Sequence, residues 1–253
     1  SSDVSSSDLL PIEERHYPAL LSLVQPATLA HRLLDPFAGE GAFLEAAAQA
    51  WNLTPYANEL DGERAAACIS RFGAKQAVRC DVERLLASNN AFSAAWLNPP
   101  YDHDPLLKDS KRVEFSYLRH AWKWIQDGGL ALWCIYAHHI TEDAALFLAR
   151  HSRSVDVWAL PGKHLGEYDQ VVVAAIKGEN PHPEPLYNAI LAQKAAPRPL
   201  TVQSEPVYKL PPPPSVNRFV FAPDVIDPEQ GLRLIQEGGA WKSNGFQALL
   251  DVP

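Results

Sequence analysis

Short apolar segments alternate with helix-forming segments between about residues 30 and 178, and this alternation limits the possible folds most strongly. Parallel strands need a crossover of a dozen or more residues, which a helix supplies. The alternation therefore predicts an α/β fold with a mostly parallel, seven-stranded sheet covered by helices on both faces. The predicted strands lie in RLLDPF (32–37, with the strand ending at Asp35), PYANEL (55–60), QAVRCD (76–81), FSAAWL (92–97), LALWCIYA (130–137), SVDVWALP (154–161) and QVVVAAIKG (170–178). The predicted helices between them are GAFLEAAAQAWN (41–52), DGERAAACISRFG (61–73), ERLLASNN (83–90), EFSYLRHAWKWIQDGG (114–129) and TEDAALFLARHS (141–152).

The same pattern divides the chain into three parts. Residues 1–30 have helical apolar spacing interrupted by prolines, which predicts one or two short helices. Residues 31–178 contain the predicted sheet, and residues 179–253 form a proline-rich C-terminal extension. In the extension we expect PHPEP, APRPL and KLPPPPSVN to be extended, followed by a short strand (218–223) and a helix (228–239).

Composition excludes several classes of protein. A formal net charge of −8 and a pI near 5.6 argue against coating nucleic acid through bulk electrostatics, although a local basic cleft is compatible with them. No apolar run is long enough to span a membrane. The scattered Cys68, Cys80 and Cys134 have no metal-ligand spacing and predict reduced thiols in a cytoplasmic protein without a metal site. The chain begins at Ser1 and lacks methionine, so its ends need not be the native ends.

Polar side chains stand at or next to the carboxyl ends of the first four predicted strands: Asp35, Glu59, Asp81 and Asn98. Each alone is usually solvated surface. Together they lie where ligands bind in open parallel sheets. Gly39 and Gly41 follow the first strand, and glycines at a strand–helix junction let a ligand approach the backbone and the helix N-terminus. A tight structural turn is the alternative for the glycines taken alone.

The fourth strand ends in the segment LNPPYD (97–102), an unusual way to end a strand. Proline fixes φ and lacks an N–H, so the two prolines fix the directions of nearby carbonyl groups. They could simply stiffen a loop. The alternative is a rigid backbone that directs Asn98, Pro99, Pro100 and Tyr101 at a ligand.

The segments DPFAGEG and NPPY, together with Glu59 and Asp81, resemble motifs I to IV of the class I S-adenosylmethionine-dependent methyltransferases. The pairing of DPFAGEGAFL with NPPY is most similar to the amino-group, N6-adenine DNA methyltransferases. The resemblance covers about residues 30–178, and it implies a Rossmann-like methyltransferase domain over 31–178 with S-adenosylmethionine as the cofactor. In that family the target adenine is flipped out of the duplex or presented on a single strand.

The resemblance also implies roles for individual residues. The methionine part of the cofactor would be surrounded by Asp35, Phe37, Ala38, Gly39 and Gly41. Glu59 would hold the ribose, Leu60 would pack on adenine, and Asp81 with Val82 would contact the adenine edge. Asn98 would lie beside the cofactor, and Asn98, Pro99, Pro100 and Tyr101 would be the catalytic residues.

The resemblance leaves the substrate open. The leading candidate for the methyl acceptor is N6 of adenine in DNA. Other candidates are N6 of adenine or N2 of guanine in ribosomal or other RNA, and the side-chain amide of glutamine in a protein. A different class of function is a catalytically silent cofactor-fold subunit or scaffold. Because the extension is small and the chain acidic, we expect low sequence specificity, a single-stranded or mobile-element substrate, or a partner subunit for target recognition.

Other residues give weaker signals. Trp122, Trp124 and Trp133 are expected in the core, and His138 and His139 could line the cleft without forming a metal site. Tyr17 could close over the cofactor, and Tyr168 could supply a second base-stacking surface. Two interpretations stay open for the basic residues after NPPY: they could contact phosphates, or they could form a solvent-exposed surface. These residues are Lys108, Lys111, Arg112, Arg119 and Lys123. The basic residues of the extension are Lys194, Arg198, Lys209, Arg218, Arg233 and Lys242.

Overall fold

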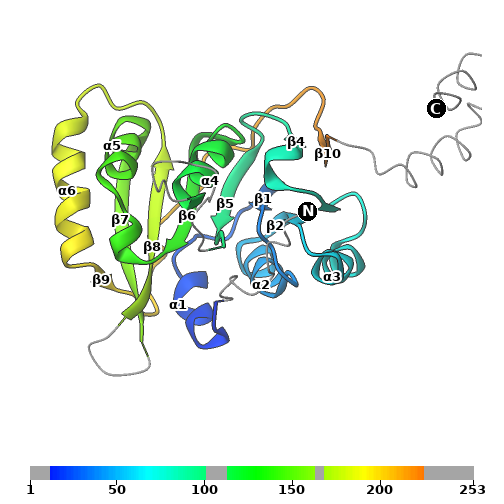
Figure 1. The fold of residues 1–253 in the computed structure, drawn as a ribbon, viewed down its shortest axis with the longest axis horizontal. Coiled ribbons are helices and arrows are strands. Elements are labelled where there is room, and N and C mark those ends of the chain that lie inside the picture. The colour runs from blue at the N-terminus through cyan, green and yellow to red at the C-terminus, as the bar shows by residue number, and fades with distance from the viewer. Residues whose placement is uncertain (1–11, 101–112, 163–167, 225–253) are drawn as a thin grey trace, which may run out of the picture.

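The computed structural model describes residues 12–100, 113–162 and 168–224 (Figure 1). In these residues eight strands form one sheet in the order β3-β2-β1-β5-β6-β8-β7-β9. Strand β8 is antiparallel to both of its neighbours, and the other pairings are parallel. The bounds are β1 His31–Asp35, β2 Leu53–Glu59, β3 Ala77–Arg79, β5 Phe92–Leu97, β6 Ile125–Ile135, β7 Ser152–Pro161, β8 Tyr168–Lys177 and β9 Arg198–Pro199. The predicted fold class is confirmed, with β9 added to the seven predicted strands.

Helices cover both faces of this sheet (Figure 1). One face packs against α1, α2 and α3, and the other packs against α4, α5 and α6. The helices are α1 Tyr17–Leu21, α2 Ala42–Trp51, α3 Gly62–Phe72, α4 Val113–Trp122, α5 Glu142–His151 and α6 Pro183–Ala195, with short 3-10 turns η1 Glu14–His16, η2 Val82–Arg84 and η3 Ala137–His139.

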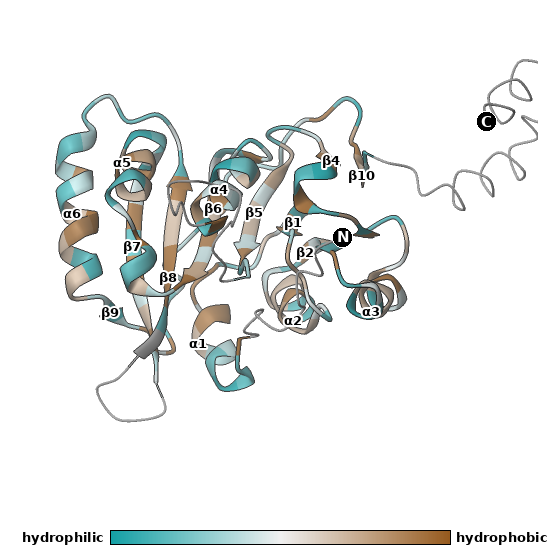
Figure 2. Cartoon of the chain, viewed as in Figure 1, coloured by the Kyte–Doolittle hydropathy of each residue, from teal (hydrophilic) through white to brown (hydrophobic). Residues whose placement is uncertain are grey.

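The central strands are apolar on both faces, and this divides the core into two layers. Along β6, Leu130, Leu132 and Cys134 pack toward α2, whereas Ala131 and Trp133 pack toward α4 and α5. This alternation is the period-two geometry of a strand buried on both sides. In Figure 2 the central strands are largely hydrophobic, while the helices carry both hydrophobic and hydrophilic residues. Trp122, Trp124 and Trp133 are buried, as predicted.

Two predicted helices are wrong in part. The segment 83–90 contains the end of η2 and a short strand, β4 (Leu85–Ala87), in place of a helix. The helix predicted over 114–129 ends at Trp122, and β6 begins at Ile125. Ile125 pairs with Phe92 of β5, and Gly128 has a φ of 73°, which a helix does not allow. Pairing with β5 therefore overrides the helical pattern of this segment.

The segment after residue 178 is more regular than predicted. PHPEP contains the first turn of α6, because proline is tolerated where its missing N–H has no helical partner. Gln193 on α6 extends the hydrogen bonding of the sheet: its side chain accepts from the Val157 N–H and donates to the Val155 carbonyl. Strand β9 then pairs with β7.

Residues 211–224 cross the sheet as an extended strap. The predicted strand at 218–223 is present in part as β10 (Phe221–Pro223), which pairs with β4. The Phe219 ring packs against Tyr56 and Phe92, with centroids 4.9 and 5.7 Å away, and the Arg32 guanidinium lies over its face. These aromatic contacts cover the sheet where no helix connects β3 to β5. The predicted helix at 228–239 lies outside the described residues.

Candidate functional site

The parallel arrangement of β3, β2, β1 and β5 brings the polar strand ends to one edge of the sheet. Asp35 and Glu59 are the last residues of β1 and β2 and are 3% and 4% exposed. Asn98 directly follows β5 and is also buried. Asp81 follows β3, and its carboxylate is exposed. The predicted site residues whose positions the structure describes therefore lie at the same carboxyl edge of the sheet.

The turn between β1 and α2 has a fixed conformation. The Asp35 carboxylate accepts from the Phe37 N–H at 3.0 Å, and the Ala38 N–H donates to the Asn58 carbonyl. Gly39 and Gly41 have φ values of 57° and 81°, a region that favours glycine. A Cβ atom on Gly41 would lie 2.6 Å from the Phe72 ring, so this glycine also permits α2 and α3 to approach.

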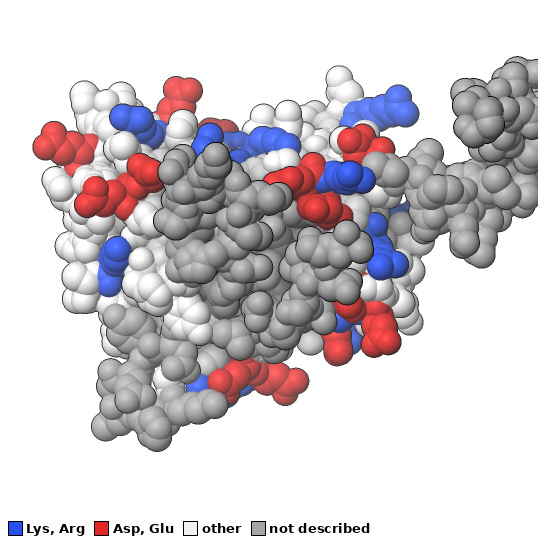
Figure 3. All heavy atoms as spheres, viewed as in Figure 1, with Lys and Arg blue, Asp and Glu red and all other residues white. Residues whose placement is uncertain are grey.

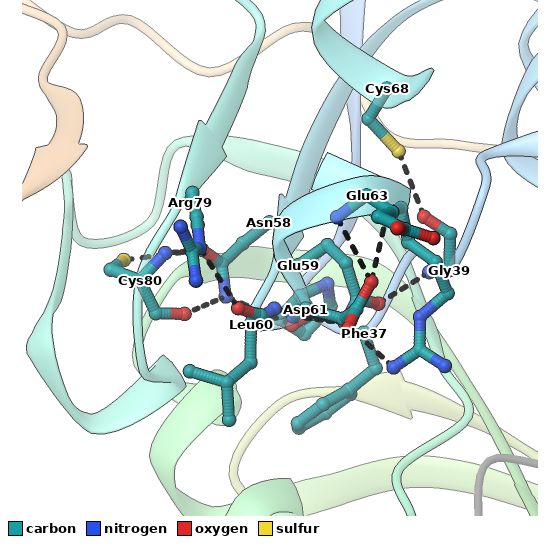
Figure 4. A network of polar contacts seen from close by, with 12 residues as sticks. Phe37, Gly39, Asn58, Glu59, Leu60, Asp61, Glu63, Cys68, Arg79 and Cys80 are labelled. Atoms are coloured by element: carbon teal, nitrogen blue, oxygen red, sulfur yellow. Dashed lines mark hydrogen bonds and ion pairs between the residues drawn. The ribbon is translucent and has the colours of Figure 1, made fainter. Parts of the chain in front are cut away.

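The Glu59 carboxylate is at the centre of a hydrogen-bond network that joins β1, β2 and α3 (Figure 4). Its Oε2 accepts from the Gly39 N–H at 2.8 Å. Its Oε1 accepts from the N–H groups of Leu60 and Asp61, both at 2.9 Å, and from the Arg64 guanidinium at 3.0 Å. Glu59 thus ties the glycine turn to the first turn of α3.

Asp35 lies in a much less polar position than Glu59. Burial raises its pKa to about 8, and the neighbouring Glu59 carboxylate adds to this increase, whereas the hydrogen bond from the Phe37 N–H opposes it. At neutral pH Asp35 is therefore mostly protonated. A cation placed beside Asp35 would favour its ionised form.

The residues expected to contact adenine form a mixed surface beside this network. Leu60 is 55% exposed at the tip of β2, which leaves its apolar side chain available to a flat ligand. The Asp81 carboxylate caps η2 by accepting from the Glu83 N–H at 2.9 Å. Val82 packs its side chain into the core, so only its backbone faces this edge. The Phe37 ring lies 5.0 Å from that of Tyr117 on α4.

Asn58 is a residue that the sequence interpretation missed. Its amide nitrogen donates to the carbonyls of Pro36 and Cys80, at 3.2 and 3.1 Å. Its amide oxygen accepts from the Cys80 N–H at 3.2 Å. One buried side chain therefore holds the ends of β1, β2 and β3 together. The available signal was an asparagine inside an apolar strand, at a position where burial needs hydrogen-bond partners.

The part of the edge beyond β1 is built from β5, β6 and α4. Asn98 and Pro99 are buried and Pro100 is half-buried, whereas Tyr101 lies outside the described residues. Beyond β6, the Nδ1 atom of the buried His139 lies 3.1 Å from a carboxylate oxygen of the buried Glu114 of α4. The His138 ring stacks on Tyr136, 5.6 Å between centroids. The Glu114–His139 contact fixes the start of α4 against the end of β6.

Tyr17 and Tyr168 have different positions in the fold. Tyr17 begins α1 and packs its ring edge-on against Phe43 of α2, at 5.1 Å. Burial raises the Tyr17 pKa. Tyr168 begins β8, and its predicted role in base stacking stays a prediction.

The described basic residues do not form one surface. Lys123 lies near the amino end of β6, because α4 runs opposite to the strands, and its ammonium packs over Trp124. Lys194 donates to the Ile140 carbonyl, and Arg198 lies over Trp158. On the face in Figure 3, the described Lys and Arg side chains are interspersed with Asp and Glu. Arg119, Lys209 and Arg218 are exposed. Lys108, Lys111, Arg112, Arg233 and Lys242 lie outside the described residues.

The part of the chain that the structure describes contains no group of three or more His, Cys, Asp or Glu placed to hold a metal ion. Within that part, no helix is both long and apolar enough to cross a membrane. Cys68, Cys80 and Cys134 form no disulfides.

Solved structures with this architecture define the class of fold. A class I S-adenosylmethionine-dependent methyltransferase structure from Listeria monocytogenes has a TM-score of 0.53 at 13% identity, covering 74% of this chain and 73% of its own. A type I restriction-modification methyltransferase subunit from Streptococcus thermophilus has a TM-score of 0.52 at 12% identity, covering 74% of this chain and 53% of its own. The EcoKI M protein has a TM-score of 0.50 at 14% identity, with 70% of this chain and 46% of its own covered. The fold is that of the class I S-adenosylmethionine-dependent methyltransferases.

The sequence family agrees with this fold. A profile of the uncharacterised methyltransferase family DUF6094 matches residues 14–212, so the chain belongs to that family. No curated protein matches the chain. The chain spans about half the length of the two restriction-modification subunits.

Proposed function

We propose that this protein transfers a methyl group from S-adenosylmethionine to an exocyclic amine, most specifically N6 of adenine in DNA. The observation that carries the proposal is the buried Asn98, followed by Pro99 and Pro100, at the end of β5. This strand is the neighbour of β1, whose glycine turn adjoins Glu59. The position and residue types therefore combine a cofactor edge with an amine-binding segment.

The cofactor would lie along the ends of β1, β2 and β3. Glu59 would accept hydrogen bonds from the ribose hydroxyls, and the exposed Leu60 would pack on adenine. Asp81 and the Val82 backbone would contact the adenine edge. Phe37, Ala38, Gly39 and Gly41 would surround the methionine part, where Asp35 would face the positive charges of the cofactor. Cofactor binding at this edge thus uses a network that β1, β2 and α3 already form.

The chemistry at the amine depends on position more than on acid–base catalysis. The lone pair of an exocyclic aromatic amine is delocalised into the ring, so the amine is a weak nucleophile. An Asn98 side-chain oxygen and the Pro99 carbonyl, accepting from the two amine protons, would favour a pyramidal nitrogen with an available lone pair. That lone pair attacks the methyl carbon as the carbon–sulfur bond breaks, and the product ammonium releases its proton to water. Alignment of the two reactants supplies most of the rate enhancement.

The nature of the substrate follows from the reach of this site. An adenine inside a duplex cannot place N6 against Asn98, so the base must be flipped or single-stranded. Tyr101 would stack on it. Since Lys and Arg are interspersed with Asp and Glu on the face in Figure 3 and the net charge is −8, we propose low sequence specificity or a partner subunit that binds the nucleic acid.

The test is methyl transfer from labelled S-adenosylmethionine to duplex DNA, single-stranded DNA, RNA and protein pools, with the modified nucleosides identified by mass spectrometry. We expect N6-methyladenine in DNA. Asn98→Ala should reduce the rate at least about 100-fold while changing S-adenosylhomocysteine affinity less than about threefold. The matched control is Asn217→Ala, at an exposed position of the strap. Equal loss of binding and activity in Asn98→Ala, or methylation of RNA or protein alone, would contradict the proposal.

A further inference from the structure

The two oxygens of the Glu59 carboxylate have different numbers of hydrogen-bond donors. Oε2 accepts one N–H group, from Gly39. Oε1 accepts from two backbone N–H groups and from the Arg64 guanidinium. A carboxylate oxygen offers about two lone pairs. Oε2 can therefore take another donor, whereas Oε1 already accepts from three donors, so a ribose hydroxyl could bind Oε1 only in place of one of them.

The backbone donors to Oε1 are held in place by other contacts. The Asp61 carboxylate caps α3 by accepting from the N–H groups of Glu63 and Arg64, at 3.1 and 3.0 Å. The Arg79 guanidinium donates to the Leu60 carbonyl at 3.2 Å from the other side of the turn. Moving the Leu60 or Asp61 N–H would therefore break the start of α3. These two donors are fixed by the fold.

Of the three donors to Oε1, the Arg64 guanidinium can move with the least change to the backbone, because it alone belongs to a side chain. It lies at the end of a flexible side chain that is 25% exposed, so water is available to solvate it after it moves. Its charge is also the wrong sign for this position, because S-adenosylmethionine carries a sulfonium and an ammonium group.

We propose that Arg64 competes with the cofactor ribose for Oε1 of Glu59 and thereby sets the affinity for the cofactor. This inference rests on the proposed role of Glu59 in holding the ribose. Before binding, the guanidinium satisfies Oε1 and balances the charge of the buried carboxylate. On binding, a ribose hydroxyl takes its place on Oε1, the second hydroxyl donates to Oε2, and Arg64 turns toward solvent. Arg64 is thus a positioning residue that lowers cofactor affinity.

Arg64→Met tests the inference, because methionine keeps much of the length of the side chain and removes the donor and the charge. Calorimetry with S-adenosylhomocysteine should show affinity higher by about three- to tenfold, the range expected for removing one charge-assisted competitor. The gain should disappear with the 2′,3′-dideoxy analogue of the same ligand, which has no ribose hydroxyl. Arg64→Lys keeps the charge without the planar guanidinium. Its affinity for S-adenosylhomocysteine should lie between those of the unsubstituted protein and Arg64→Met.

Arg71→Met is the matched control, since Arg71 lies on the same helix but pairs with Glu45. It should leave both affinities unchanged. Unchanged or weaker S-adenosylhomocysteine binding in Arg64→Met, or an equal gain for the dideoxy analogue, would overturn the inference. Glu59→Gln distinguishes a failure of the proposed ribose role of Glu59 from a failure of the proposed competition by Arg64. If Glu59→Gln binds as the unsubstituted protein does, the ribose role itself is wrong. If only Glu59→Gln changes the affinity, the competition by Arg64 is wrong.

Discussion

Replacing Asp35 with asparagine should change how the free energy of unfolding depends on pH. Burial raises the pKa of Asp35 from 3.8 to about 8 in the folded protein. Between these two values the folded chain keeps a proton that the unfolded chain has lost. The folded state therefore binds more protons, and the stability falls as pH rises through this window until about pH 8.

The size of the effect follows from the width of that window. Each pH unit is worth about 1.4 kcal/mol when one proton separates the two states. Between about pH 6 and about pH 8 the loss from Asp35 is at most about 3 kcal/mol. Asparagine does not titrate, and its side-chain oxygen can still accept from the Phe37 N–H. Asp35→Asn should therefore lose less stability than the unsubstituted chain over this range.

Urea unfolding at several pH values, followed by circular dichroism, measures this difference directly. The matched control is Asp61→Asn, because Asp61 is not fully buried and its pKa is lowered, chiefly by the hydrogen bond from the Arg64 N–H. The stability that the Asp61 carboxylate contributes is present above its ordinary pKa and is lost only in acid. Its replacement should not alter the slope above about pH 6. Parallel curves for Asp35→Asn and the unsubstituted chain would show that Asp35 is already ionised when folded.

Two further substitutions test the framework of the site. Asn58→Leu removes the partners of the Pro36 carbonyl and of both backbone groups of Cys80, so the free energy of unfolding in urea should fall by at least about 3 kcal/mol; a loss below about 1 kcal/mol would contradict the role of Asn58. Phe219→Ala should cost about 1–2 kcal/mol and speed proteolysis of residues 211–224, because its ring packs on Tyr56 and Phe92; Val220→Ala, at an exposed position, is the control, and equal proteolysis of both variants would contradict the strap contacts.

The sequence predicts the sheet and its polar edge well because both depend on local periodicity. Each central strand is buried on two faces, so it reads as an apolar run, and its last residue marks the edge. Asp35, Glu59 and Asn98 could therefore be placed together without knowing the strand order, since parallel strands end at the same edge. The glycine turn could be predicted for the same reason, because it directly follows the first of these apolar runs in the sequence.

The contacts that the sequence does not predict join distant segments. Strand β4 exists because it pairs with β10, more than a hundred residues later, and its own sequence favours a helix. The prolines of PHPEP suggest an extended segment until the start of α6 is known. Arg64 appears as an ordinary residue of an amphipathic helix, and only the approach of α3 to β2 shows its contact with Glu59. Each of these depends on tertiary contacts that override local propensity.

The two halves of the site depend on the chain in different ways. Glu59 and Asn58 hold strand ends together through several buried hydrogen bonds each, so the half of the site proposed to bind the cofactor is also part of what stabilises the fold. Changes there should alter stability and cofactor affinity together. Asn98, in contrast, follows a strand already fixed by its pairing with β1 and β6. Because that strand pairing does not use the Asn98 side chain, a change at Asn98 should affect methyl transfer more than it affects the pairing of β5 with its neighbours.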